Sequence, residues 1–196
     1  MDKVYQVVDC EEGIFRAYDI RGLVGSQLNE NVYFTIGCAI AQILKKINRD
    51  NIVIAWDGRL TSEDYAQALE QGLGLYGIKV TRLGVVPTAS MYYATCKLGI
   101  DCGLMVTGSH NPKEYNGIKI VFAGHNAQQE QIAEILAVCK ELPQTHTYAK
   151  KDYHSEMVDI ISPYVQEILA DVTLSRPLKV IADFGHGVGA VIGPQL

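Results

Sequence analysis

The sequence lacks the cysteine patterns and long apolar runs that mark several classes of protein. Its five cysteines are Cys10, Cys38, Cys96, Cys102 and Cys139. Their number is odd and no two form a C-x-x-C pair, which argues against a disulfide framework and against a zinc site. No apolar run approaches membrane-spanning length, and the first residues lack the apolar core of a signal peptide. We therefore expect a reduced, cytoplasmic protein without a membrane partner.

Basic clusters are also absent. The 17 basic and 22 acidic residues leave a formal net charge of −5, and no run of Lys or Arg rises above this mild acidity. We therefore expect no nucleic-acid partner. A phosphorylated substrate stays compatible with this composition, because a few cations at one site can outweigh the mean charge.

The 196 residues, 48% of them apolar, suffice for one domain, or for one domain and the beginning of another.

Helix and strand patterns alternate along the chain. Apolar residues between 36 and 47 fall on one face of a helix, with Asn29 as its expected N-cap. Further helices are expected at about 61–77, 87–97 and 127–141. Asn126 and Gln129 resemble a capping box for the last of these helices. Short apolar runs predict strands at 51–55, 78–83, 102–106 and 118–123, whereas residues 13–25 are expected to form a glycine-punctuated loop.

This alternation predicts an α/β fold. We expect a three-layer α/β/α domain with a mixed, mostly parallel sheet over residues 1–150. Asn116-Gly117 is a turn signal, and the short spacing predicts that strand 118–123 pairs antiparallel. The polar residues 142–154 have no period and are interpreted as a linker.

The remaining residues repeat the pattern in part. A helix from Ser155, a strand at 178–182 and a glycine-rich turn at 183–189 predict the start of a second, similar domain over residues 155–196. This second domain is expected to be incomplete. Its strand would then have an unpaired edge, through which the chain is expected to self-associate.

The segment most informative about chemistry is Thr107-Gly108-Ser109-His110-Asn111-Pro112, directly after the strand at 102–106. Ligands of open α/β sheets bind beyond the carboxyl ends of strands, and a tight turn there can aim backbone N–H groups at an anion. Taken alone, the segment could be a polar connecting turn, an anion site, or a hydrolase site in which His110 activates Ser109. The hydrolase reading is weak, because adjacent side chains rarely align for this proton transfer and G-x-S-x-G is absent.

Four segments together resemble the α-D-phosphohexomutase superfamily, in the order typical of that family. They are FRAYDIRGLVG (15–25), WDGRLTS (56–62), GVVPTASMYYA (84–94) and TGSHNPKEYNGIKI (107–120). The bacterial phosphomannomutase/phosphoglucomutase branch is the most similar. The resemblance implies interconversion of hexose 6-phosphate and hexose 1-phosphate, with mannose or glucose as the sugar. It also implies a phosphoserine and a hexose 1,6-bisphosphate intermediate such as glucose 1,6-bisphosphate.

The resemblance also assigns expected roles to individual residues. Ser109 would carry the phosphoryl group and, through its phosphate, supply one ligand of a catalytic Mg²⁺. Lys119 would serve in proton transfer or stabilise developing charge beside the phosphoserine; the alternative from sequence alone is an edge-strand lysine. Arg21 would neutralise charge next to Ser109, and Tyr18 would face the sugar. His110 either orients the reacting hydroxyl or makes a structural bond within the loop.

Other residues are assigned no chemistry. Asp57 and Arg59 are expected to form an ion pair that braces a loop. His125, His146 and His154 lie in polar stretches and receive no role. Trp56 stands where members of the family usually have a smaller or polar residue, which bears on loop packing.

Two departures from the family bear on function. The turn at 183–189 reads DFGHG where D-x-G-N-G is expected, and the D-G-D-x-D loop that holds Mg²⁺ in the family is expected beyond residue 196. We therefore expect the fragment alone to be inactive. The alternatives are a phosphoglucosamine mutase, whose serine loop is similar, and a truncated, non-catalytic binding module.

Overall fold

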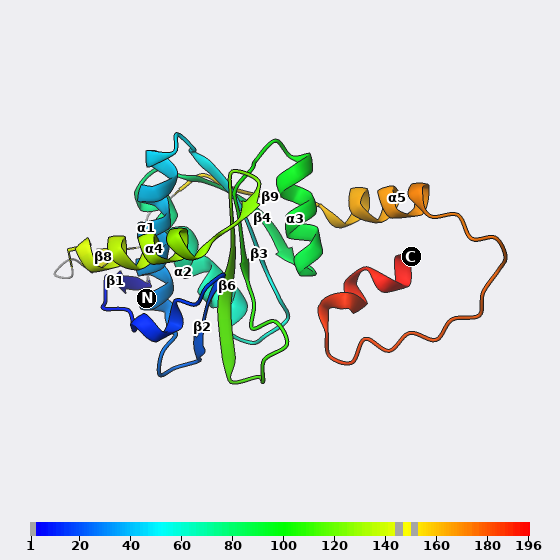
Figure 1. Cartoon of the computed structure of the whole chain (residues 1–196), viewed down its shortest axis with the longest axis horizontal. Coiled ribbons are helices and arrows are strands. Elements are labelled where there is room, and N and C mark those ends of the chain that lie inside the picture. Colours follow the sequence, from blue (N-terminus) through cyan, green and yellow to red (C-terminus); the bar gives the residue numbers. More distant parts are fainter. Residues whose placement is uncertain (1–2, 144–146, 150–152) are drawn as a thin grey trace.

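The computed structural model describes residues 3–143, 147–149 and 153–196 (Figure 1). Its main sheet has seven strands. Six lie in the order β2 (Asp19–Leu23), β6 (Tyr115–Phe122), β5 (Gly103–Val106), β3 (Asn51–Trp56), β4 (Lys79–Val85) and β9 (Ser155–Met157). The short β7 (His125–Asn126) pairs with β6. Only β6 runs against the other strands of this sheet, since its pairings with β2, β5 and β7 are antiparallel and the rest are parallel. The sheet is therefore mixed and mostly parallel, as the sequence predicts.

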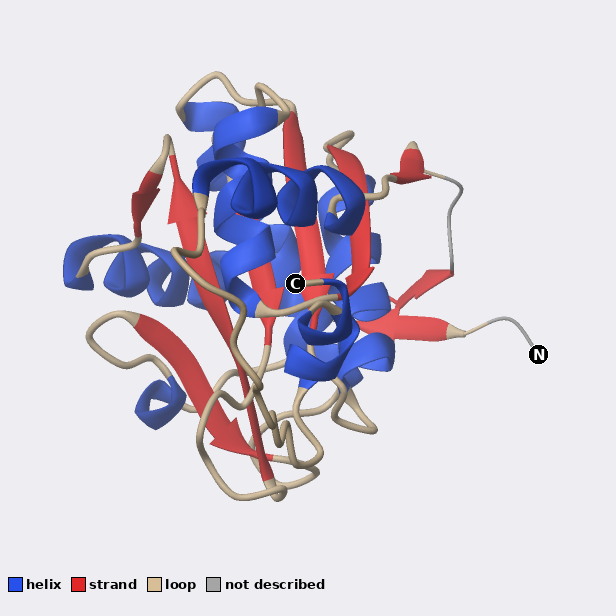
Figure 2. Cartoon of the chain, turned by 90° about the vertical axis from the view of Figure 1, so that its right-hand side faces the viewer, coloured by secondary structure: helices blue, strands red, loops and turns tan. Residues whose placement is uncertain are grey.

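Helices cover both faces of the sheet (Figures 1 and 2). On one side lie α1 (Glu30–Lys46), α2 (Ser62–Leu75) and α4 (Gln129–Glu141), and on the other lies α3 (Thr88–Lys97). A two-stranded antiparallel sheet of β1 (Val4–Gln6) and β8 (Thr147–Ala149) packs on α1, where the ring of Phe34 contacts Tyr5 and Tyr148. A short 3-10 helix, η1 (Glu12–Ile14), precedes β2. Among the described residues, no helix is long and apolar enough to cross a membrane.

The apolar sequence of β3 explains why both faces are covered. Ile52, Ile54 and Trp56 pack into the core beneath α1 and α2, whereas Val53 and Ala55 pack beneath α3. Alternate side chains of a strand point to opposite faces, so a run that is apolar throughout needs a helix layer on each side. This requirement places β3 in the middle of the sheet.

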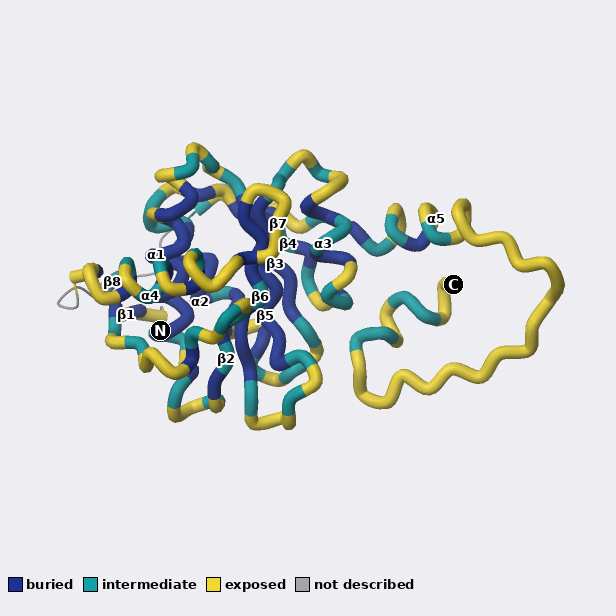
Figure 3. The backbone as a smooth tube through the Cα atoms, viewed as in Figure 1, coloured by how far each residue is buried: buried dark blue, intermediate teal, exposed yellow. Residues whose placement is uncertain are grey.

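The C-terminal residues have little regular structure. After α5 (Ile161–Asp171), residues 172–187 are exposed and form no helix or strand (Figure 3). Two short 3-10 helices follow, η2 (Val188–Val191) and η3 (Gly193–Gln195). At the start of this region, Ile160 and Val165 are buried. Figure 1 shows the chain leave α5, loop outward and return beside the body of the protein.

Two predictions near the serine segment were wrong. Residues 19–23 are not a loop but strand β2, paired antiparallel with β6. Asn116-Gly117 is not a turn but lies inside β6, opposite Gly22 and Arg21. The chain reverses earlier, between β5 and β6. Gly117 is needed there for close approach, since an added Cβ would overlap the carbonyl of Ile20.

Two further predictions needed correction towards the C-terminus. The capping box of α4 is made by Gln128 and Gln131, because Asn126 belongs to β7. Residues 155–157 form β9, and α5 begins at Ile161. The early Pro163 is tolerated there because N–H groups in the first turn have no helical partner.

The prediction of a strand at 178–182 was also wrong, and part of the expected linker at 142–154 forms a strand. Residues 147–149 form β8, while 144–146, which include His146, and 150–152 lie outside the described residues. Residues 178–182 form no strand. The domain boundary near residue 150 stays a prediction, although β9 joins the same sheet as β4.

Candidate active site

The carboxyl ends of the parallel strands open on one cavity. It has a volume of about 580 Å³ and is lined by residues 57–59 after β3, 86–88 after β4 and Thr107, Ser109, His110 and Lys113 after β5. Residues 186–189, which lie far away in the chain, form part of the same lining. The cavity therefore lies at the edge of the sheet where ligands of open α/β folds bind.

Ser109 has an unusual backbone conformation at this cavity. Its φ angle is 54°, in the left-handed region that costs a non-glycine residue about 1–3 kcal/mol. Its N–H donates to Oγ1 of Thr107 at 2.8 Å. Gly108 before it has no room for a side chain, because an added Cβ would overlap the guanidinium of Arg59. The surrounding contacts thus hold Ser109 in a strained turn at the cavity wall.

Asp57 binds the start of this serine loop (residues 107–113) from the neighbouring strand. Its Oδ2 accepts hydrogen bonds from Oγ1 of Thr107 at 2.8 Å and from the N–H of Gly108 at 3.2 Å. Its Oδ1 accepts from Oγ of Ser62 at 2.6 Å and from the N–H of Arg59 at 3.0 Å. One carboxylate oxygen therefore holds the serine loop, and the other holds the start of α2 and the loop after β3.

Arg59 binds the end of the same loop. Its guanidinium donates to the carbonyl oxygens of Pro112 at 2.7 Å, Asn111 at 2.6 Å, Tyr115 at 3.0 Å and Ser109 at 3.2 Å. It also contacts the Asp57 carboxylate at 3.2 Å. A lysine has no planar fork with which to span several acceptors at once. These bonds agree with the expected loop-bracing pair.

Asn116 is a structural residue that the sequence reasoning missed. It is buried, and its side-chain NH₂ donates to the hydroxyls of Thr61 and Ser62 at 3.0 Å each. Its oxygen accepts from the N–H of Gly117 at 2.8 Å. Every polar group of the amide is thus engaged, and the residue ties β6 to the start of α2. The polar Asn116 next to the apolar run of this strand was the sequence feature that could have indicated its structural role.

Arg21 reaches the serine loop from β2. Its Nη1 donates to Oδ1 of Asn111 at 3.1 Å, and its Nη2 pairs with the Asp19 carboxylate at 2.6 Å. Both side chains of this ion pair are largely buried, with 26% of Arg21 and 16% of Asp19 exposed. The structure thus brings Arg21 to the loop through Asn111, a partner that the sequence did not indicate.

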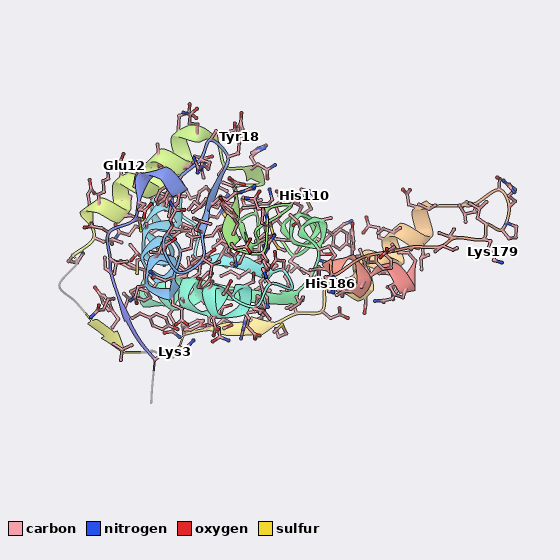
Figure 4. All side chains as sticks on the ribbon, turned by 90° about the horizontal axis from the view of Figure 1, so that it is seen from below. Lys3, Glu12, Tyr18, His110, Lys179 and His186 are labelled. Atoms are coloured by element: carbon pink, nitrogen blue, oxygen red, sulfur yellow. The ribbon has the colours of Figure 1, made fainter. Side chains whose placement is uncertain are left out.

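The other predicted site residues are distributed unevenly. His110 is exposed and lines the cavity beside Ser109. Lys119 lies on β6 opposite Met105 and Asp19, and opposite residues share a face of the sheet. Met105 lines the cavity whereas Lys119 does not. Tyr18 is 71% exposed and lies at the outer surface, apart from His110 (Figure 4). The cavity therefore joins Ser109 and His110, with Lys119 and Tyr18 outside its lining.

The described residues do not by themselves form a Mg²⁺ site. Among them, no three His, Cys, Asp or Glu side chains gather closely enough to hold a metal ion. Asp57 is the acidic residue of the described cavity lining, and its oxygens already accept hydrogen bonds from the serine loop and from Ser62. Mg²⁺ in proteins is usually held by one or two carboxylates together with phosphate oxygens and waters, and the described lining offers only the engaged carboxylate of Asp57.

Comparison with known proteins decides the family. Residues 12–146 match the profile of "Phosphoglucomutase/phosphomannomutase, alpha/beta/alpha domain I". The chain belongs to this family. The match includes the serine loop, the residues that brace it and most of the sheet, and it confirms the resemblance found in the sequence.

Individual relatives agree with this assignment. The phosphomannomutase/phosphoglucomutase of Pseudomonas syringae pv. tomato is 42% identical over 183 residues, which cover 93% of this chain and 38% of that protein. The phosphomannomutase of Vibrio cholerae is 36% identical and covers 93% of this chain and 40% of its own length. The chain thus spans about two fifths of these relatives.

A solved structure shows the same fold. The phosphoglucomutase/phosphomannomutase family protein of Burkholderia thailandensis superposes with a TM-score of 0.86 at 34% identity. The superposition covers 95% of this chain and 42% of that one. The predicted fold class, an α/β/α domain with a mixed and mostly parallel sheet, is confirmed.

Proposed function

We propose that this chain is the phosphoserine-bearing part of a phosphohexomutase that interconverts hexose 6-phosphate and hexose 1-phosphate, with mannose or glucose as the sugar. The observation that carries the proposal is the geometry of Ser109. Its strained backbone (φ 54°) lies in a loop held by Asp57 and Arg59, and the loop lines the cavity at the carboxyl edge of the sheet. Phosphoryl transfer depends mostly on positioning and on neutralising charge, and this loop supplies a fixed hydroxyl.

The proposed reaction uses Ser109 Oγ as a carrier. A phosphoryl group passes from Ser109 to a hexose monophosphate: the Oγ–P bond breaks and a bond from phosphorus to a sugar oxygen forms. The hexose 1,6-bisphosphate reorients and returns its other phosphoryl group to Ser109. The proton lost by the sugar hydroxyl needs an acceptor close to the serine, and we assign that role to Lys119, with His110 orienting the hydroxyl.

Arg21 and Tyr18 complete the proposed site. Arg21 is bonded to the serine loop through Asn111, so its charge can offset that of a phosphoryl group nearby. Tyr18, exposed at the start of β2, would face the sugar. Mg²⁺ is part of the proposal through the family resemblance, with the phosphate on Ser109 as one ligand. Since the described residues hold no ligand set for it, this chain alone should show no mutase turnover.

Phosphopeptide mapping tests the assignment of Ser109. The protein that contains this chain is incubated with Mg²⁺ and glucose 1,6-bisphosphate, and the labelled peptide is sequenced. We expect phosphate on Ser109, no stable label in Ser109→Ala, and normal label in Ser26→Ala, which removes an exposed hydroxyl elsewhere. Label on another residue together with a fully active Ser109→Ala enzyme would contradict the proposal.

Kinetics of two further variants test the roles around the serine. In the same protein, Lys119→Ala and Arg21→Ala should lower mainly kcat, by about 10²–10⁴-fold, the range for lost acid–base or charge stabilisation. Wild-type turnover in both variants would contradict these roles and leave Lys119 as an ordinary strand residue. Comparing hexose with hexosamine phosphates as substrates separates the proposed reaction from that of a phosphoglucosamine mutase.

A further inference from the structure

The turn at residues 183–189 is folded by its own contacts. Oδ1 of Asp183 accepts a hydrogen bond from the N–H of Gly185 at 2.8 Å, and the N–H of Gly187 donates to the carbonyl of Phe184 at 2.9 Å. Gly185 has a φ of 53°, a conformation that favours glycine. These bonds make a tight turn with His186 near its tip.

Packing places this turn against the serine site. The ring of Phe184 covers Gly193 so closely that an added Cβ there would overlap it. On the other side, a Cβ added at Gly58 would lie 3.7 Å from Cγ2 of Val188. The turn therefore lies beside the loop that follows β3, and His186 joins the lining of the cavity at Ser109.

The ionisable side chains of this cavity fall into two sets. Asp57 and Arg59 are bonded to the serine loop and to each other. The others, His110, Lys113 and His186, are exposed side chains of the lining, and no hydrogen bond or ion pair is found for their side chains among the described residues. Asp183, the acidic group of the turn itself, is bonded to the backbone of Gly185. The ionisable side chains left to meet a ligand thus all carry N–H groups, which can donate to a phosphoryl group.

We propose that His186 is a second histidine of the serine site, whose imidazole N–H donates a hydrogen bond to the phosphoryl group carried by Ser109. This inference rests on the function proposed above. A phosphoserine loses its second proton near pH 6. A donor that favours the dianion lowers that pKa, because hydrogen bonding to the more highly charged form stabilises it. Removal of His186 should therefore raise the second pKa of the phosphoserine.

Phosphorus NMR on an installed phosphoserine tests this contact. Phosphoserine is incorporated at position 109 of the chain by genetic code expansion, so that no mutase activity is needed, and its ³¹P shift is titrated between about pH 4.5 and pH 8, on either side of its second pKa. In His186→Gln the second pKa should rise by about 0.5–1 unit relative to the unsubstituted chain. His125→Gln is the matched control, since His125 is an exposed histidine on β7, at the opposite end of β6 from the serine loop.

The outcomes separate this inference from the proposed function. If His186→Gln titrates like His125→Gln, the contact between His186 and the phosphoryl group is absent and the inference is wrong. If glucose 1,6-bisphosphate fails to label Ser109, the proposed reaction fails, yet the titration still reports whether His186 faces position 109. Because His186 lies on an exposed turn, its substitution should leave the fold intact, which the circular dichroism spectra of the two variants check.

Discussion

Two segments of this chain share a sequence pattern and differ in structure. Residues 53–58 (VIAWDG) and 180–185 (VIADFG) both run from the same three apolar residues into an Asp and a Gly. The first segment ends the central strand β3, and its Ile54 is fully buried. The second forms no strand, and its Ile181 is 94% exposed.

The difference lies in the neighbours of each segment. Strand β3 pairs with β4 on one edge and β5 on the other, and helices cover both its faces. Residues 178–182 pair with no strand in the described part of the chain. Ordering the backbone costs about 1–2 kcal/mol per residue, which ladder hydrogen bonds and burial must offset. An apolar run with an Asp-Gly end therefore becomes a strand only where partners flank it.

The largest expected effect comes from shortening the matched isoleucines. Ile54→Ala should lower the free energy of unfolding by about 2–5 kcal/mol, because it leaves a cavity in a closely packed core. Ile181→Ala should change it by no more than about 0.5 kcal/mol, since this side chain is in water. Urea titrations of both variants measure the two values. Similar losses would mean that residues 178–182 are packed in solution as β3 is.

The aspartates at the ends of the two segments should also differ. Asp57→Asn replaces an acceptor-only group by an amide and so disturbs the bonds to Thr107, Gly108 and Ser62, at a cost of about 1–3 kcal/mol. Asp183→Asn should stay within about 0.5 kcal/mol, because an exposed Asn can make the same turn. Urea titration measures both, and a destabilising Asp183→Asn would contradict the contrast.

Glu70, in the packed region, should make stability depend on pH. It is fully buried, and burial raises the pKa of its carboxyl above the ordinary 4.5. The hydroxyl of Tyr153 donates to it at 2.6 Å, and Arg82 lies 3.1 Å away without hydrogen-bond geometry; both contacts oppose the shift. Just above pH 4.5 the folded state holds this proton more tightly than the unfolded state does. This contribution to stability therefore falls as pH rises through the raised pKa.

The substitution Glu70→Gln tests this pH dependence, because glutamine does not titrate. The free energy of unfolding, measured at several pH values from about 4.5 upward, should fall with pH more steeply in the unsubstituted protein than in Glu70→Gln. Glu156→Gln, which removes an exposed carboxyl on β9, is the matched control and should leave the slope unchanged. Parallel curves for all three proteins would show that Glu70 does not hold its proton in the folded state.

The smallest expected effect is weak self-association through the exposed segment. Val180 and Ile181 are 73% and 94% exposed, and an unpaired extended run can pair with another copy. The apparent mass of the chain in size-exclusion chromatography should rise with concentration, and Ile181→Lys should reduce this rise. A mass that stays monomeric at every concentration would mean that the exposed run does not pair.

The sequence predicted most helices well, and it predicted the positions of turns less well. The helix at 30–46 with its Asn29 cap follows from apolar spacing and a short polar side chain, and it is present. Asn116-Gly117, in contrast, suggested a turn and lies in β6. A dipeptide reports only what its own backbone can adopt, whereas Asn116 is held by Thr61 and Ser62 from another part of the chain.

The candidate site also has a part that the sequence predicted and a part that it did not. Its serine segment and its position after a strand were visible as a short motif, because the residues that form the turn are contiguous. The brace at Arg59 reaches across about fifty residues to the carbonyls of the serine loop. His186 comes to the same cavity from still further along the chain. Strand ends in the sequence place such loops at one edge of a sheet, but no spacing rule shows which of their atoms meet there.

The sequence by itself determined the family, the α/β alternation and the serine at the end of β5, because each is carried by contiguous residues whose propensities act locally. Only the tertiary structure decided that 53–56 forms a strand while 180–182 does not, that Asp57 and Arg59 hold the serine loop, and that His186 shares its cavity. The physical reason is that these outcomes depend on which backbone donors, acceptors and apolar faces meet across the chain. These contacts are determined by the packing of the whole sheet and its helices.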